Sequence, residues 1–387
     1  MPTRQRRLLI EGWRSLPQSY SLVNECQILE FLSRPEISIA HRDMPYLLPR
    51  WQPQSGLFAP EQEKLLMSLP APAAGERFDA VYRIAAPYDL SPSPSSDRTV
   101  VFCTAEFGNV PAIYMSGRRP LSEAHRNNPT IITTASNWSR EGFLHAGAAA
   151  ERVVVVPHGV DPKIFAPLDE AQRAEARRKL GWDGFIFLTV GSATPNKGMD
   201  LLFKAIAAIV GTHRQVQLVV KGIDVIYNSD KKIQQAAEKL TQQEIARLDS
   251  RVHYRGGVGS LVEMATLYQL ADAYVAPYRA EGFGLPVLEA IACGLPVICT
   301  AGGATDDFVR DDFALRISSK LVHLQSYDEP GIQLEPNLDH LIELMKRVIE
   351  QPEIARRART AGPEFVRANY TWRHAVDKLM PLLFPQT

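Results

Sequence analysis

Two carboxylates flank a glycine-rich stretch whose residue types suit the binding of a phosphorylated sugar. Residues 281–289 read Glu-Gly-Phe-Gly-Leu-Pro-Val-Leu-Glu, so seven residues separate Glu281 from Glu289. Pro286 is typical of the first turn of a helix, where its missing N–H would have no partner, and Gly294 is typical of the residue just past a helix end. We therefore expect Glu281 in the loop before a short helix and Glu289 about one turn inside it.

The start of this helix is also a predicted anion site. The N–H groups of Phe283, Gly284 and Leu285 would have no partner within the helix and would point outward. A phosphate bound there would have one carboxylate on each side, and both carboxylates could accept hydrogen bonds from sugar hydroxyls. A capping glutamate or an ordinary Gly-x-Gly turn would explain either feature alone. The whole stretch favours a ligand site.

A second motif leads from a predicted strand, through a turn, to a predicted helix. The strand at residues 185–190 is followed by Gly191 and Ser192, and Lys197 comes just before the next helix. A lysine in this place could neutralise a diphosphate as a point charge while it leaves. A solvated loop lysine is the alternative, but the strand and the following Gly198 favour a fixed geometry.

Two further strand ends carry candidate binding residues. Lys221 ends the strand at residues 216–220 and could add a second charge to the same region. Val258 follows a predicted strand at residues 252–254, where the backbone could hold a nucleotide base. The nine histidines are scattered without the spacing of metal ligands.

Composition limits the class of protein. The 387 residues suffice for two domains, and 43 basic residues balance 43 acidic ones, so a partner drawn by charge, such as nucleic acid, is not implied. No apolar run is long enough to span a membrane. The four cysteines lie in apolar surroundings without a C-x-x-C spacing, which is typical of reduced core thiols in a cytoplasmic protein.

Strand and helix patterns alternate along the whole chain, which predicts parallel sheets with helices on both faces. The predicted strands in the first half are residues 7–11, 37–40, 80–85, 100–104, 131–134 and 153–156, with helices at 20–33 and 137–146. The second half has strands at 185–190, 216–220, 252–254, 273–276 and 297–299. Its helices are predicted at 170–180, 199–209, in a long polar stretch that ends near 247, at 261–270, and from 337 to the end with a break at 369–372.

The predicted fold class is α/β, with two doubly wound, Rossmann-like domains facing a central cleft. We place the domains at residues 1–165 and 166–370, and we expect the last helix, residues 371–387, to pack back on the first domain. In such sheets ligands bind outside the carboxyl ends of the strands, which is where the motif loops fall.

Taken together, these motifs resemble the retaining glycosyltransferases of family GT4, which have the two-domain GT-B fold. The matching stretches are residues 155–161 with Phe165 and Pro167, residues 190–198, residues 281–289, and Gly302-Gly303. The acidic pair with seven residues between is the most specific of them, and the order and spacing agree from about residue 131 onward. The N-terminal third matches only in general layout.

The resemblance implies a role for each motif residue. Glu281 would contact hydroxyls of the donor sugar, and Glu289 would accept a hydrogen bond from the nucleotide ribose. Lys197 would bind the diphosphate, the N–H groups around Phe283–Leu285 would touch sugar and phosphate, and the base would lie near Val258. The implied reaction transfers a sugar from a nucleotide-diphosphate sugar to an acceptor hydroxyl with retention at the anomeric carbon, a hexosyltransferase activity of glycan or glycoconjugate biosynthesis.

The sequence departs from the family pattern at two places. Arginine commonly follows the strand-turn glycine in this family, but here that residue is Ser192, so we expect Lys221 or Arg279 to replace it or the donor to bind weakly. The first strand is followed by Gly12-Trp13-Arg14-Ser15 instead of the usual glycine pair. Glu106, after the strand at residues 100–104, is a candidate catalytic residue facing the acceptor or the anomeric carbon, with a surface glutamate as the alternative.

Three other functions compete with that of a transferase. A nicotinamide-dependent dehydrogenase would need G-x-G-x-x-G after a strand, and both Gly257-Val258-Gly259 and Gly282-Phe283-Gly284 lack the last glycine. A nucleotide-sugar epimerase of the same fold and a non-catalytic sugar-nucleotide binding protein stay open. Only Ser192 favours the latter. We expect no cofactor and no metal, because the chain has no Asp-x-Asp pair.

The expected partners are a nucleotide-sugar donor and a glycan, lipid-linked or protein acceptor. A peripheral contact with the inner membrane face would be compatible with the Arg4, Arg6 and Arg7 cluster and with exposed side chains near Trp51. Ordinary solvated charge is the simpler explanation of that cluster.

Overall fold

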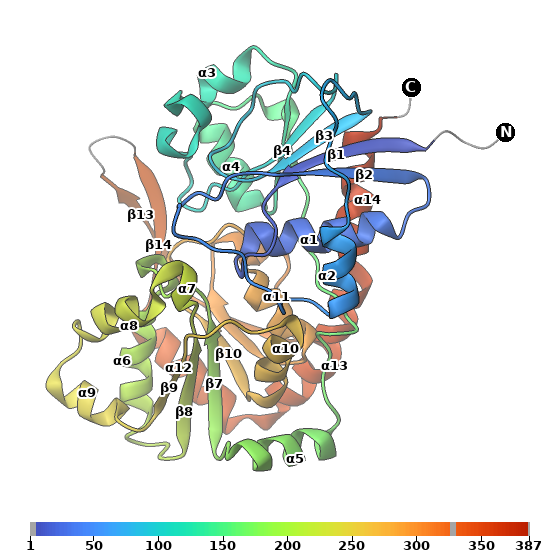
Figure 1. Ribbon diagram of the computed structural model, residues 1–387. Coiled ribbons are helices and arrows are strands. Elements are labelled where there is room, and N and C mark those ends of the chain that lie inside the picture. The colour runs from blue at the N-terminus through green and yellow to red at the C-terminus, as the bar shows by residue number, and fades with distance from the viewer. Residues whose placement is uncertain (1–4, 326–329, 386–387) are drawn as a thin grey trace. The chain divides into compact units, whose positions relative to one another are not determined.

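The computed structural model describes residues 5–325 and 330–385, which separate into two compact units (Figure 1). The first unit comprises Met1–Gly159, Leu324–Gly331 and Tyr370–Thr387, and the second comprises Val160–His323 and Ile332–Asn369. The chain therefore passes from one unit to the other at Gly159, a few residues before the boundary predicted at 165, and its last helix belongs to the first unit. Arg4 and residues 386–387 of the predicted last helix lie outside the described residues.

The first unit is built on a six-stranded parallel sheet with the order β2-β1-β3-β4-β5-β6. Its strands carry continuous buried apolar runs, as in β1, where Leu8, Leu9 and Ile10 are all buried. Continuous apolar strands are typical of parallel sheets that helices cover on both faces. The strands are β1 (Arg6–Gly12), β2 (Ile37–Asp43), β3 (Ala80–Ile84), β4 (Thr99–Phe102), β5 (Ile131–Thr134) and β6 (Val153–Val155).

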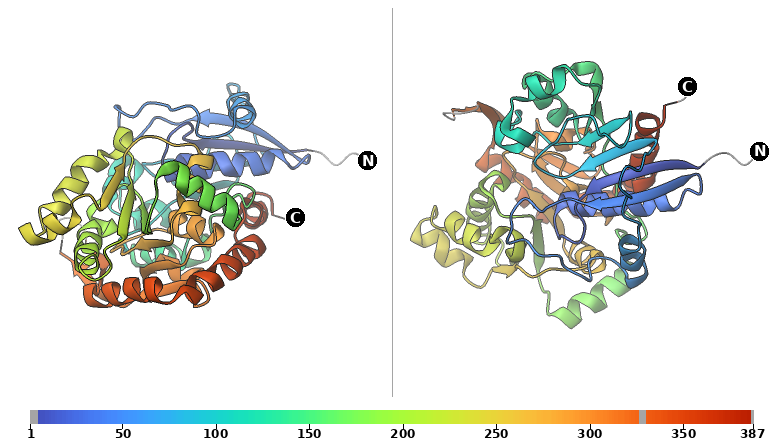
Figure 2. Two further views of the ribbon diagram at one scale, coloured as in Figure 1. Left: turned by 90° about the horizontal axis from the view of Figure 1, so that it is seen from below. Right: turned by 45° about the horizontal axis from the view of Figure 1, so that its top comes forward.

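The helices of the first unit begin at side-chain caps where the sequence supplies them. The Ser136 hydroxyl accepts a hydrogen bond from the N–H of Ser139, and Thr371 caps the last helix in the same way. Figure 2 shows the C-terminal helix beside α1, and the two helices are in contact. The helices are α1 (Ser19–Leu32), α2 (Pro60–Met67), α3 (Leu121–Arg126), α4 (Asn137–His145) and α14 (Trp372–Leu383).

The second unit has its own six-stranded parallel sheet, with the order β12-β11-β10-β7-β8-β9. The chain starts in the middle with β7, adds β8 and β9 on one side, and then returns to add β10, β11 and β12 on the other. The order therefore reverses between β7 and β10. The strands are β7 (Phe185–Val190), β8 (Val216–Lys221), β9 (Val252–Arg255), β10 (Ala273–Ala276), β11 (Val297–Thr300) and β12 (Ala314–Ile317), and a separate two-stranded sheet pairs β13 (Ser319–Leu324) with β14 (Gly331–Pro336).

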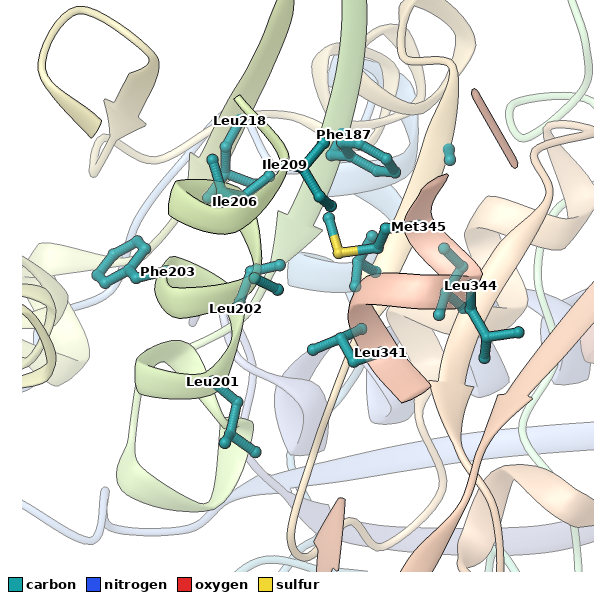
Figure 3. Packing of buried hydrophobic residues seen from close by; sticks show 14 of the residues in the cluster. Phe187, Leu201, Leu202, Phe203, Ile206, Ile209, Leu218, Leu341, Leu344 and Met345 are labelled. Carbon is teal, nitrogen blue, oxygen red and sulfur yellow. The ribbon is translucent and has the colours of Figure 1, made fainter. Parts of the chain in front are cut away.

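Helices cover both faces of this second sheet. On one face α6 packs against β8 and α12 packs against β11 and β12, and the two helices contact each other, with Leu202, Ile206 and Met345 in one buried cluster (Figure 3). On the other face α10 and α11 are neighbours (Figure 1). The helices are α5 (Glu170–Leu180), α6 (Met199–Ile209), α7 (Asp224–Tyr227), α8 (Ser229–Ala237), α9 (Gln242–Leu248), α10 (Leu261–Leu270), α11 (Leu285–Ala292), α12 (Leu338–Glu350) and α13 (Pro352–Asn369).

One helix prediction is wrong. The polar stretch that ends near residue 247 is not one long helix but the three short helices α7, α8 and α9. The helix is interrupted between α7 and α8 because Asn228 adopts a left-handed conformation, with φ of 49°. A second interruption precedes α9, because the side chains of Thr241 and Glu244 form a capping box that starts a new helix. The stretch lacks an apolar face long enough to hold one helix together.

Candidate functional site

The two main motif loops lie next to each other at the point where the second sheet reverses its strand order. β7 ends at Val190 and β10 ends at Ala276, and the two strands are hydrogen-bonded neighbours with Phe187 opposite Ala273. In a doubly wound sheet the loops that leave these two carboxyl ends diverge and form the ligand-binding crevice. The sheet topology therefore brings Gly191–Lys197 and the loop before α11 to one place.

Asn196 fastens the two loops to each other. Its side-chain N–H donates to the carbonyl of Ala280 at 2.9 Å, and its own carbonyl accepts from the N–H of Arg279 at 2.6 Å. The asparagine is largely buried, so both bonds are shielded from competing water. The backbone just before each of the two motif residues, Lys197 and Glu281, is thus held through Asn196, by its side chain and by its backbone carbonyl.

Gly198 allows these loops to approach so closely. Its φ is 69°, in the left-handed region, and a Cβ atom there would lie 2.0 Å from the carbonyl oxygen of Pro277. No side chain fits at that distance. Glycine is therefore required both for the conformation and for the contact.

Lys197 and Glu281 form an ion pair at the centre of this arrangement. The Lys197 ammonium donates to Glu281 Oε2 at 2.6 Å, and the two side chains are 23% and 17% exposed. The other carboxylate oxygen of Glu281 accepts from the N–H of Gly282 at 3.1 Å. A cation and a carboxylate with this degree of access could meet a phosphate and a sugar hydroxyl, respectively.

The start of α11 has the geometry expected of an anion site. Gly284 has a φ of 93° and caps the helix, and its carbonyl accepts from the N–H groups of Val287 and Leu288. Within the described residues no acceptor reaches the N–H of Gly284 or of Leu285. The Phe283 ring is buried against Phe308, with 5.0 Å between centroids. Two backbone donors at a helix start therefore remain for a ligand.

Glu289 lies one turn inside α11, as predicted, and contacts a tyrosine that the sequence did not single out. The hydroxyl of Tyr268, on α10, donates to Glu289 Oε2 at 2.7 Å. Burial raises the pKa of Glu289 to about 7, and the hydrogen bond from Tyr268 acts in the opposite direction. The Glu289 carboxylate therefore titrates near neutral pH, unlike an ordinary surface glutamate.

Ser192 is bonded within the protein, and Arg279 does not take the place of the arginine that is usual at this position. The Ser192 hydroxyl is bonded to that of Thr194 at 2.8 Å, and the Ser192 carbonyl accepts from Ser229. The expectation that Arg279 could replace the usual arginine is wrong, because Arg279 binds Asp200 through two nitrogens and Glu335 through two. These pairs raise the pKa of Arg279 and leave its charge neutralised.

The ammonium group of Lys221 is also bonded to groups of the protein. The residue is only 6% exposed, and its ammonium donates to the carbonyl of Gly257 at 2.7 Å and to that of Gly222. Desolvation lowers the pKa of Lys221 to about 8. The lysine thus ties the loop that carries Val258 to the end of β8, and it does not extend toward solvent as a diphosphate ligand would.

Glu106 stands apart from these residues because it belongs to the first unit. It follows β4 and is partly buried, and its carbonyl accepts from the indole N–H of Trp138 at 2.8 Å. Two polar residues at or after the end of β3 also have partners within the first unit. Arg83 pairs with the buried Glu11 at 2.7 Å, and Tyr88 bonds Tyr20.

The carboxyl edge of the first sheet is filled by aromatic side chains. The loop residue Trp13 contacts Trp51 with 5.8 Å between ring centroids, and His158 lies between Phe102 and Trp372. Trp51 itself is buried, at 5% exposed, whereas Leu47 nearby is 38% exposed. Arg7 pairs with Glu76, and its side chain stays 41% exposed.

Sequence reasoning missed the residues that support the site. Asn196 adjoins Lys197 and follows a proline, but no local pattern shows that it bonds a loop 84 residues away. Tyr268 occupies an apolar position of a helix, where an aromatic residue is usually a core residue. In the described residues no group of three or more histidine, cysteine or acidic side chains could hold a metal ion, and no helix there is long and apolar enough to cross a bilayer.

The two doubly wound, parallel-sheet units define the two-domain fold class called GT-B. Solved structures have the same fold over nearly the whole chain. That of Anabaena HepE in complex with UDP and glucose matches with a TM-score of 0.71 and 16% identity, covering 98% of this chain and 99% of that one. Sucrose-phosphate synthase from Thermosynechococcus elongatus matches with a TM-score of 0.67 and 18% identity, covering 98% of both chains. The predicted fold class is thereby confirmed.

Sequence comparison assigns the family. Residues 172–365 match the model of glycosyl transferases group 1, which covers half of the chain, and the protein belongs to that family. It is 31% identical over 284 residues to D-inositol 3-phosphate glycosyltransferase 1 of Catenulispora acidiphila, covering 71% of this chain and 61% of the relative. It is 23% identical to mannosylfructose-phosphate synthase of Agrobacterium fabrum, covering 62% of this chain and 49% of the relative. The chain spans about half the length of the curated relatives it matches.

Proposed function

We propose that the protein transfers a sugar from a nucleotide-diphosphate sugar to an acceptor hydroxyl with retention at the anomeric carbon. The observation that carries the proposal is the Lys197–Glu281 ion pair beside the start of α11, where the N–H groups of Gly284 and Leu285 have no acceptor among the described residues. The arrangement offers a cation and two oriented N–H donors to a diphosphate. It offers a carboxylate on each side to sugar and ribose hydroxyls.

The residue roles follow from this chemistry. When the donor binds, Lys197 would exchange Glu281 for the diphosphate, and Glu281 would accept hydrogen bonds from the donor sugar. Glu289 would accept from the ribose, and Lys221 would support the loop with Val258 against which the base rests. Positive charge and oriented N–H groups fixed before the reaction would stabilise the departing nucleotide diphosphate, which is the part of the reaction where charge develops. Glu106 would act on the acceptor from the first unit.

The family membership supports a transferase over an epimerase or a simple binding protein. The solved Anabaena structure holds UDP and glucose, so a UDP-hexose is the donor to test first. We propose that the acceptor is a glycan or a lipid- or protein-linked saccharide. No cysteine of the chain is in a disulfide, which supports a reducing, cytoplasmic site of action.

A donor screen tests the proposal. The pure protein is titrated calorimetrically with UDP-, GDP-, ADP-, dTDP- and CMP-linked sugars, with and without EDTA, and again as Glu289→Ala. We expect saturable binding of one nucleotide class that EDTA does not change and that the variant loses. NMR of the transfer product with saccharide acceptors would then show the α-configured linkage expected for retention from an α-linked donor, and Glu106→Gln should slow transfer without weakening donor binding. A protein that binds none of the five donors would contradict the proposal.

A further inference from the structure

Tyr268 is a buried residue whose hydroxyl ends at the proposed ribose-binding carboxylate. The side chain is completely buried on α10, and its hydroxyl donates to Glu289 Oε2 at 2.7 Å. Its ring contacts Phe165 on one side and Tyr274 on the other, with centroids 6.1 Å and 5.8 Å away. A ring enclosed in this way cannot turn its hydroxyl elsewhere, so it fixes the orientation of the carboxylate.

Tyr274 extends this support to the second motif. Its hydroxyl donates to the carbonyl of Val190 at 3.3 Å, at the last residue of β7. The loop with Gly191 and Ser192 starts at that residue. The two tyrosines in contact therefore connect the glutamate of α11 with the strand end that leads to Lys197.

Only one oxygen of Glu289 is used by the protein. Oε2 accepts from Tyr268, and no donor among the described residues reaches Oε1. A carboxylate held at one oxygen has the other available to accept from a ligand hydroxyl. We infer that Tyr268 is a positioning residue for the donor: its hydroxyl keeps Glu289 ionised and aimed, so that Oε1 can accept from the ribose. This inference rests on the proposed function.

The surroundings of Glu289 predict how its charge depends on pH. Tyr268 from α10, Tyr274 from β10 and Cys293, which follows α11, face it, and burial raises the pKa of each, so all three are neutral near pH 7. The other carboxylate that acts on Tyr274 is Glu281, which is paired with Lys197. With no cation among these neighbours, burial raises the pKa of Glu289 to about 7.

The pKa of Glu289 determines the direction in which donor affinity should change with pH. Glu289 is ionised above its pKa and protonated below it, so donor affinity should fall as the pH is lowered through about 7. The hydrogen bond from Tyr268 favours the ionised form. Removal of that hydroxyl should raise the pKa of Glu289 further and move the midpoint of binding to higher pH.

The experiment is a calorimetric titration with UDP-glucose between pH 6 and pH 9. The diphosphate of this donor is a diester that does not titrate in that range. The wild type is compared with Tyr268→Phe, which keeps the packed ring, and with Glu289→Gln. Tyr82→Phe is the matched control, because it also removes the hydroxyl of a buried tyrosine but lies in the first unit.

We expect the midpoint of binding to move up by about one pH unit in Tyr268→Phe, which corresponds to affinity about fivefold to tenfold weaker at pH 6–7. At pH 9 the affinities of this variant and of the wild type should converge. Tyr82→Phe should follow the wild type throughout, and Glu289→Gln should bind weakly with little dependence on pH.

The outcomes separate this inference from the proposed function. If Tyr268→Phe keeps wild-type affinity and midpoint, or if its loss is the same at every pH, the tyrosine acts by packing alone and the inference is overturned. If Tyr268→Phe does not fold, the carboxyl ¹³C signal that Glu289→Gln removes is titrated in the wild type, and a carboxyl that stays protonated throughout pH 6–9 overturns the inference, because Tyr268 would then not keep Glu289 ionised. A wild type that binds no nucleotide sugar would overturn the proposed function, and the inference with it.

Discussion

The carboxyl edges of the two sheets differ although both sheets are parallel and doubly wound. In the second unit the edge consists of glycine turns, an ion pair and backbone donors that are fixed by Asn196. In the first unit the corresponding loops are packed with rings, and the hydroxyls of Tyr20 and Tyr88 bond each other at 2.6 Å. The same topology therefore marks a place for a ligand in both units, but the loop residues decide whether charged and polar groups remain available there.

The family match follows the same division. It covers residues 172–365, which belong to the second unit except for Leu324–Gly331, while Met1–Gly159 and Tyr370–Thr387 of the first unit lie outside it. A site built from charged side chains and backbone donors tolerates few substitutions, because each donor must keep its direction. An edge made of packed rings can change its side chains while its volume is preserved.

The largest effect that would sharpen the comparison is expected from Lys197→Met. This variant removes the charge proposed to stabilise the leaving diphosphate, and we expect turnover to fall by about 10²–10³-fold, or about 3–4 kcal/mol of transition-state stabilisation. Initial rates with saturating UDP-glucose and acceptor measure it. The control is Lys231→Met, an exposed lysine on α8. Equal losses in both variants would contradict a specific role for Lys197.

The next largest effect concerns the turn that brings the two loops together. Gly198→Ala should destabilise the protein by about 3 kcal/mol, because it adds a Cβ to a left-handed residue and against a carbonyl. Gly181→Ala is the matched control, since its φ is 63° but no atom lies within 4 Å of the new Cβ. It should lose about 1 kcal/mol. Urea denaturation measures both, and a Gly198→Ala variant no less stable than the control would refute the close approach.

A third prediction tests the packed edge of the first unit. Burial lowers the pKa of His158 to about 3, so its ring is neutral in the folded protein, whereas an unfolded histidine titrates near 6.5. The resulting stability is complete above pH 6.5 and is lost progressively as the pH falls toward 3. Between pH 7 and pH 5 the loss should be about 2 kcal/mol.

His158→Phe isolates that contribution, because it keeps an aromatic ring between Phe102 and Trp372. The difference in unfolding free energy between pH 7 and pH 5 should shrink by about 2 kcal/mol relative to the wild type. Urea denaturation at the two pH values gives this difference. A variant with unchanged pH dependence would show that the histidine is solvated, and that the first edge is more open than its ring contacts indicate.

The smallest expected effect is a gain of affinity. Ser192→Arg would supply a second cation beside Lys197, and since Arg279 and Lys221 are both committed elsewhere, nothing yet fills that role. Donor affinity should rise about threefold to tenfold, which is about 1 kcal/mol. Calorimetry with UDP-glucose measures it, and Ser192→Ala serves as the control. Weaker binding in Ser192→Arg would mean that the serine itself contacts the donor.

Local signals in the sequence were enough to predict the motif positions. Proline and glycine bounded α11, and strand ends placed Glu281, Glu289 and Lys197 as the structure has them. The contacts of these residues were not predictable, because the Lys197–Glu281 pair joins positions 84 residues apart. The same holds for Arg279, whose partners Asp200 and Glu335 come from other elements.

The missed elements have a common cause. β13 is largely exposed, so its sequence lacks the apolar alternation that marks a strand. β12 is only four residues long, and its pattern is interrupted by the exposed Arg316. The error between α7 and α9 came from the left-handed conformation of Asn228, which residue type favours but does not require, and from the capping box at Thr241. Long-range contacts and single dihedral angles are the parts of this fold that periodicity does not encode.

The ion pair of Lys197 and Glu281 also determines how an anionic donor first meets the protein. Two opposite charges whose nearest atoms are 2.6 Å apart largely cancel at distances beyond about 10 Å, where salt already screens any remaining field at about 0.1 M. This pair therefore does little to steer a sugar nucleotide from solution, and the rate of encounter should depend weakly on ionic strength. Discrimination between donors would then lie in how long each one stays, because the exchange of partners at Lys197 begins only on contact.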